Sequence, residues 1–156
     1  MWRTASGLTR LVVTLGFATV AIAQGVGGRV RYVGGTLDEI PTGTGGILLT
    51  GNDRFLVFDS RKVNYAIPWD RINLLEYGQR VSRRYALAVM ISPLLLAAKK
   101  RVHYLTIGFL DRKDRQQALV FEVDKHDIRA LLVVLEARTN LRVEYQDDEA
   151  RKSGKG

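Results

Sequence analysis

Short runs of apolar residues divide most of the chain into strand-length pieces. Residues 47–50 and 55–58 flank Gly51-Asn52-Asp53, where Gly and Asn tolerate the positive φ of a tight turn. Both runs are rich in β-branched or aromatic side chains, which is typical of strands. Pro68 ends a later run, since proline donates no ladder hydrogen bond. The pattern predicts a meander of short strands, at residues 29–33, 47–50, 55–58, 65–67, 72–77, 102–110 and 117–123.

One long amphipathic helix is predicted after the last of these strands. Asp124 is a suitable N-cap, and Asp127 three residues on acts much like the acidic partner of a capping box. Arg138 in the last turn and Asn140, which adopts the left-handed conformation readily, mark its end. A core-facing stripe follows the i, i+3, i+4, i+7 spacing at Ile128, Leu131, Leu132 and Leu135.

The order of elements predicts a mainly β fold with one C-terminal helix, an α+β class. The strand–turn–strand of residues 46–58, the Ile-Pro-Trp-Asp-Arg-Ile step at 67–72 and the helix at 127–138 resemble a bacterial pleckstrin-homology-like (GRAM-like) domain. The resemblance covers most of residues 27–140. It implies a partly open seven-stranded barrel that the amphipathic helix caps. The first interstrand loop carries Asp38 and Glu39 where phosphoinositide-binding members carry basic residues, so phosphoinositide binding is not expected.

The first 23 residues have the pattern of a secretory signal peptide. Arg3 and Arg10 form a positive n-region, residues 11–23 are uncharged and apolar, and Ala21-Ile22-Ala23 fits a small-x-small cleavage site. The alternative is an uncleaved N-terminal anchor, although the apolar run is shorter than the ~20 residues of a spanning helix. We expect a periplasmic or secreted protein cleaved after Ala23, with a barrel domain at 24–143. Residues 144–156 are expected to form a charged flexible tail, after a short extended piece at 141–145.

The charge and cysteine content narrow the classes of partner. Without Arg3 and Arg10 the chain has 22 basic and 16 acidic residues, a net charge of +6. Such a surplus favours an anionic partner. Export argues against nucleic acid, and no run of interleaved basic and aromatic residues supports it. The chain has no cysteine, so neither disulfides nor a thiol-linked lipid contribute.

No catalytic or cofactor signature is present in the sequence. His103 and His126 are not surrounded by other ligand-type residues at metal-site spacing. The glycine cluster at 42–46 opens into a strand, not a helix, and lacks the Gly-Lys-Ser/Thr ending, which argues against nucleotide binding. Trp69 is more typical of a partly buried residue at a barrel edge than of a recognition aromatic. We therefore expect no enzyme, no cofactor and no metal.

The segment of residues 83–101 is the best candidate for a functional site. Residues 85–98 carry no charge, both flanks are basic, and 14 residues are too few to span a bilayer. An apolar piece of this kind must be buried by the barrel, by a partner or by lipid. Two functions remain open: association with an anionic membrane surface, or an interaction scaffold for an envelope protein. The residues expected to make the contact are Arg83, Arg84, Leu94, Leu95, Lys99, Lys100 and Arg101.

Overall fold

A computed structural model describes residues 27–79, 102–146 and 148–155 of the chain. All seven predicted strands are present, and the protein is mainly β with a helix after the last long strand. The strands are β1 (Gly27–Gly35), β2 (Gly45–Leu49), β3 (Phe55–Asp59), β4 (Asn64–Pro68), β5 (Ile72–Gly78), β6 (His103–Leu110), β7 (Gln116–Val123) and the two-residue β8 (Glu144–Tyr145). The helices are the short 3₁₀ turn η1 (Trp69–Arg71), α3 (Ile128–Thr139) and α4 (Asp148–Lys155).

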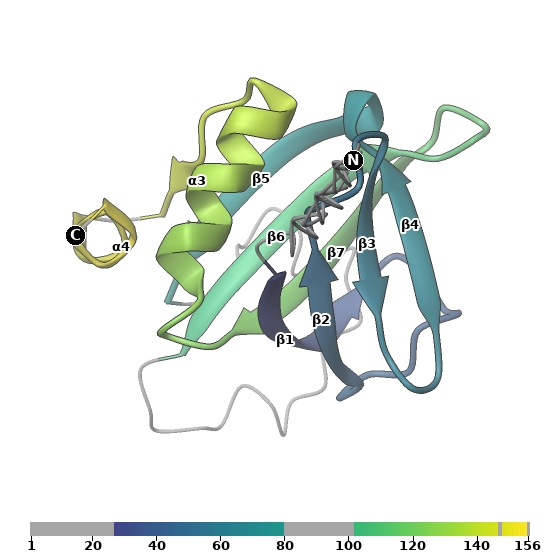
Figure 1. Cartoon of the computed structure of the whole chain (residues 1–156), viewed down its shortest axis with the longest axis horizontal. Coiled ribbons are helices and arrows are strands. Elements are labelled where there is room, and N and C mark those ends of the chain that lie inside the picture. Colours follow the sequence, from purple (N-terminus) through teal and green to yellow (C-terminus); the bar gives the residue numbers. More distant parts are fainter. Residues whose placement is uncertain (1–26, 80–101, 147, 156) are drawn as a thin grey trace, which may run out of the picture.

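The strands form one sheet in the order β4-β3-β2-β1-β7-β6-β5-β8. Every neighbouring pair is antiparallel except β5 and β8. Strand β1 joins the two halves, because Val30 lies opposite Gly46 of β2 on one side and Val123 of β7 on the other. In Figure 1, β2, β3 and β4 stand on the right, β5, β6 and β7 cross the centre at an angle to them, and α3 lies on the left beside β5.

The concave side of the sheet and one face of α3 enclose the main core. Aromatic side chains from both halves meet there: the ring of Phe121 lies 5.1 Å from that of Phe58 and 5.8 Å from that of Tyr32, centroid to centroid. Leu131 and Leu135 of α3 are fully buried in the same cluster, as the helical stripe predicted. The main core therefore depends on α3 covering the open side of the sheet.

The start of α3 differs from the prediction. The helix begins at Ile128 with Asp127 at the N-cap, and Asp124 instead begins a turn whose carbonyl accepts the amides of Asp127 and Ile128. The carboxylate of Asp127 accepts hydrogen bonds from the backbone and the guanidinium of Arg29, at 2.9 and 3.1 Å. These bonds tie the helix start to β1. The far end is as predicted, because Asn140 is left-handed with φ 57°.

The β2–β3 connection is a hairpin loop, but its turn chemistry is not the predicted one. In the described part of the chain, positive φ among residues other than glycine occurs only at Asp114 and Asn140. Asn52 instead accepts the amides of Arg54 and Phe55 with its side-chain oxygen, at 2.8 and 3.0 Å. Its backbone carbonyl accepts the indole N–H of Trp69 at 2.8 Å. Trp69 is buried in the main core, more completely than the partly buried edge position that the sequence predicts.

The C-terminal residues form a short strand and a helix. Within the expected extended piece at 141–145, β8 pairs with β5, and where a charged flexible tail was expected, α4 packs on α3, β5 and β8. Ala150 is fully buried, and Gly154 lies against Tyr145 and Leu132. The mainly polar α4 therefore adds one small apolar face to the outside of α3 (Figure 1).

Candidate binding surface

The residues predicted to contact a membrane or a partner all lie outside the part of the chain that the structure describes: Arg83, Arg84, Leu94, Leu95, Lys99, Lys100 and Arg101. The described strands do fix where the segment leaves and re-enters the sheet. Strand β5 ends at Gly78, which lies opposite Tyr104 near the start of β6. The described residues that flank 80–101 in the sequence therefore belong to neighbouring ends of two paired strands.

An exposed apolar surface covers the outer side of β2, β3 and β4. Leu49, Val57 and Ala66 lie opposite one another in register across the three strands. Ile47 and Phe55 extend this row on either side; Ile47 is 42% and Leu49 37% exposed. We call these five residues the β2–β4 strip. Solvent-facing sheet surfaces are usually polar, so a continuous apolar row marks a contact site.

The strip runs to an open strand edge. Among the described residues, β4 pairs only with β3 and stands at the end of the sheet. The amide of Trp69 bonds to the carbonyl of Arg54, and that of Ser60 to the carbonyl of Val63. Because bonded and non-bonded pairs alternate in an antiparallel ladder, the backbone groups of Asn64 and Ala66 face away from β3. They offer donors and acceptors to a further strand.

Sequence reasoning used the β2 and β3 runs for the fold and overlooked their second face. Ile47-Leu48-Leu49 and Phe55-Leu56-Val57-Phe58 are continuous apolar runs, without the polar residues at alternate positions that a half-exposed strand normally has. Leu48, Leu56 and Phe58 fill the core, which leaves the intervening apolar residues outside. The missing alternation was the available signal for the strip.

A shallow cleft of about 650 Å³ adjoins one end of the strip. It is lined by residues 43–47, at the end of the β1–β2 connection and the start of β2, and by residues 59–62, at the end of β3 and the turn to β4. The close approach of these two segments requires glycine at position 46, since a Cβ there would lie 2.4 Å from the carbonyl oxygen of Asp59. Arg61 and Lys62 contribute positive charge and Asp59 negative charge, so the cleft has no single charge preference.

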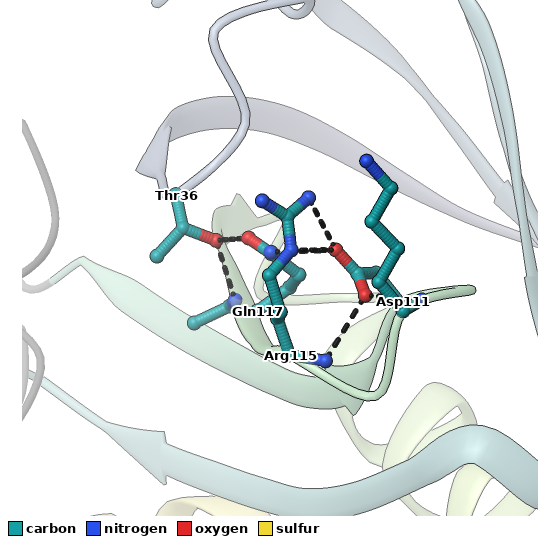
Figure 2. A network of polar contacts seen from close by, with 6 residues as sticks. Thr36, Asp111, Arg115 and Gln117 are labelled. Atoms are coloured by element: carbon teal, nitrogen blue, oxygen red, sulfur yellow. Dashed lines mark hydrogen bonds and ion pairs between the residues drawn. The ribbon is translucent and has the colours of Figure 1, made fainter.

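The polar network around Asp111 has a structural role. The carboxylate of Asp111 accepts the amides of Lys113 and Arg115 and the side chains of Arg115 and Gln117, at 2.8–3.1 Å (Figure 2). These bonds, led by the Arg115 amide, hold the pKa of Asp111 well below its usual range. Thr36 links the network to β1 by its bonds with Gln117 and the Ala118 amide. With its lone pairs occupied by donors, Asp111 fixes the β6–β7 turn and is unsuited to general-base chemistry.

The two histidines lie apart. His103 is half-buried at the start of β6, with its Nδ1 2.5 Å from the hydroxyl of Tyr77 and its ring stacked on that of Tyr77. Burial lowers the pKa of His103, against a smaller opposing effect of Asp124. His126 is exposed in the turn before α3. Within residues 27–79, 102–146 and 148–155, no three His, Cys, Asp or Glu residues are grouped as metal ligands would be.

Comparison of the sequence with known proteins assigns the chain to no family. No protein-family model matches the chain, and no curated protein is significantly similar to it. None of the helices that the structure describes is both long and apolar enough to cross a membrane.

Proposed function

We propose that this chain is a non-catalytic, exported binding module that takes up an extended segment of an envelope protein at the edge of β4. The observation that carries the proposal is the apolar β2–β4 strip, which leads directly to an open strand edge. An added strand would pair with the backbone of Asn64 and Ala66, and its apolar side chains would extend the Leu49–Val57–Ala66 row. Main-chain bonds would supply affinity, and the strip would select apolar residues.

The sheet order supports a pleckstrin-homology-like barrel as the scaffold of this module. Seven strands in the order β4-β3-β2-β1-β7-β6-β5, followed by a helix on the open side, agree with the arrangement that the resemblance implies. Such a scaffold presents its edge and loops without needing a reaction centre. The N-terminal signal pattern supports placing the module and its partner in the periplasm or outside the cell.

A proline at position 66 tests strand addition at the β4 edge. The amide of residue 66 faces away from β3, so Ala66→Pro removes an outward donor and no β3–β4 ladder bond, and proline is tolerated on edge strands. Ala66→Ser, which keeps the amide, is the matched control. Because the chain has no cysteine, a photocrosslinker attached at Val57→Cys reports only that position.

We expect a discrete crosslinked adduct in envelope fractions from the Val57 position. It should be lost with Ala66→Pro and kept with Ala66→Ser, while both variants keep the wild-type melting temperature within a few degrees. A crosslinker on Val133, an exposed apolar residue of α3, serves as the position control. Equal adducts from Val133 and Val57, or an adduct insensitive to Ala66→Pro, would exclude edge addition.

Association with an anionic membrane through residues 83–101 is the second candidate. The observation in its favour is the β5–β6 register, which makes these residues an insertion between paired strands with five basic residues near its two ends. Each basic residue near an anionic surface is worth ~1 kcal/mol. Wild-type protein should float with phosphatidylglycerol vesicles at low salt, and replacing Lys99, Lys100 and Arg101 by Glu should abolish flotation without lowering the melting temperature. Absence of wild-type flotation would end this candidate.

A further inference from the structure

A second apolar cluster lies on the side of the sheet opposite the main core. Val33 of β1, Tyr104 of β6, and Ala118 and Val120 of β7 form it, and Val102 packs against it. The four residues of the cluster are 0–6% exposed. Together with Val102 we call them the outer β6–β7 face. Its members alternate along β6 and β7 with core residues, so they point away from the main core.

The described helices do not account for the burial of this face. Helix α3 packs on β1, β5 and η1 from the core side, and α4 packs on α3, β5 and β8. Apolar side chains on the outer side of a sheet are stable only when another layer covers them. A cover for the outer β6–β7 face therefore has to come from elsewhere.

We propose that the uncharged residues 85–98 of the same chain dock on the outer β6–β7 face. The chain leaves the sheet at the end of β5 and returns at the start of β6, where Val102 already belongs to the face. The outer β6–β7 face needs a covering layer, and the uncharged residues 85–98 need an apolar surface that buries them. The strand order brings these two requirements to the same end of the sheet. The inference is independent of the proposed strand addition, which uses the other half of the sheet.

The length of the segment suits this surface. The 22 residues from 80 to 101 connect neighbouring ends of β5 and β6. Half of them, extended at ~3.3 Å per residue, reach ~36 Å, and the eight residues of β6 span ~26 Å. The segment can therefore run along the face and return, even if part of it, such as the stretch after Pro93, is helical and shorter.

A buried carboxylate on β5, that of Glu76, makes the outer side of β5 unfavourable for the docked segment and leaves β1, β7 and β6. Glu76 of β5 lies on the same side of the sheet and is buried, with its Oε1 bonded to Gln146 at 3.1 Å. Its Oε2 is buried without a hydrogen-bond partner among the described residues, and apolar residues placed over β5 would supply no donor to satisfy it. Apolar packing is more favourable over Val33, Ala118 and Val120.

Docking of residues 85–98 would also change how residues 83–101 could associate with an anionic membrane. Apolar residues held against the sheet are not available to enter a bilayer. The basic flanks at 83–84 and 99–101 then remain near the strand ends, where they can meet anionic head groups through charge alone. Vesicle binding would accordingly be weak and strongly dependent on salt.

Thiol labelling of the full-length protein tests the docking. Val120→Cys reports on the outer face and Val133→Cys on the exposed surface of α3, in a chain without other cysteines. In dilute, lipid-free solution we expect maleimide to label Val120→Cys at least ~100-fold more slowly than Val133→Cys, because opening must precede reaction at a buried site. Oxidation should join Val120→Cys to a second cysteine at Leu94 or Leu95, and should not join Val133→Cys to either.

A variant in which residues 85–98 are replaced by a Gly-Ser linker of equal length completes the test. If the segment is the cover, Val120→Cys in this variant becomes labelled almost as fast as Val133→Cys. Rapid labelling of Val120→Cys in the unaltered chain would overturn the proposal. So would protection that appears only with phosphatidylglycerol vesicles, which identifies lipid as the cover, or only at high protein concentration, which identifies a second copy. If the linker variant does not fold, the disulfide experiment decides. Failure of Val120→Cys to crosslink to a cysteine at either Leu94 or Leu95 would then contradict docking.

Discussion

At the scale of single residues, the Tyr77–His103 pair links protonation to folding. Tyr77 is fully buried and its hydroxyl lies 2.5 Å from Nδ1 of His103, with the two rings stacked at 11° between their planes. Burial disfavours the charged imidazolium and lowers the pKa of His103 from its ordinary value of 6.5. The folded protein therefore binds this proton less readily than the unfolded chain does.

The sign of the resulting pH dependence follows from this difference. Well above pH ~6.5 the imidazole is neutral in both states, and no stability is lost. As the pH falls below ~6.5 the unfolded chain takes up the proton first, so the free energy of unfolding decreases until the folded-state pKa is passed. Urea melts between pH 7.5 and 5 should show this loss in the wild type and in His126→Gln, and a smaller one in His103→Gln. If the free energy of unfolding of His103→Gln falls with pH as steeply as that of the wild type, the Tyr77–His103 pair is not the source of the pH dependence.

Glu136 shows why one side-chain role was not visible in the sequence. It lies off the apolar stripe of α3, and the helical pattern indicates a solvent-facing residue that tolerates alanine. In the structure its Oε1 accepts the amide of Val143 at 2.8 Å, which fixes the chain where it turns from α3 towards β8. That bond joins a helical residue to a residue of an irregular connection. The spacing of apolar residues in the sequence does not predict such a contact.

At the scale of elements, α3 is the part whose packing matters most for the main core. Leu131→Ala and Leu135→Ala should each lower the free energy of unfolding by about 2–5 kcal/mol, the range for removing a buried leucine. Glu136→Ala should cost about 1–3 kcal/mol, because the Val143 amide loses its acceptor. The exposed Val133→Ala should stay within about 0.5 kcal/mol of wild type. Denaturant melts that place the leucine variants level with Val133→Ala would mean that α3 is not docked.

Elements defined by a long apolar pattern were predictable, and elements defined by a few contacts were not. The α3 stripe follows from period-3.6 spacing, and the seven strands follow from short apolar or alternating runs bounded by turn residues, which the sequence displays directly. Strand β8 has two residues and depends on its parallel pairing with β5, and the sequence predicts an extended piece at 141–145 without indicating that partner. Helix α4 buries Ala150 but is mostly polar and charged, so its sequence does not separate it from a polar tail. The β2–β4 strip was missed for the opposite reason, because a continuous apolar run predicts a strand without saying which face is covered.

At the scale of the whole molecule, the sheet separates three surfaces. Its concave side holds the main core with α3, the outer side of β2–β4 carries the exposed strip, and the outer side of β6–β7 carries the second buried cluster. Strand β1 belongs to both halves and begins at Gly27, three residues after the expected new terminus at Gln24. Cleavage after Ala23 therefore removes no residue of any strand that the structure describes.

This placement predicts that the processed chain keeps its fold. A protein beginning at Gln24 should melt within about 2 °C of the full-length chain, since losing even one interaction worth ~1 kcal/mol shifts the midpoint by roughly 3–5 °C in a domain of this size. A chain beginning at Arg31 is the control and should melt far lower, because it loses the first part of β1, including Val30, which pairs with both β2 and β7. Intact mass of the exported protein should give the Gln24 terminus. A Gln24 chain that melts several degrees lower would show that the N-terminal residues pack on the rest of the fold, and full-length protein retained in the cytoplasm would overturn export itself.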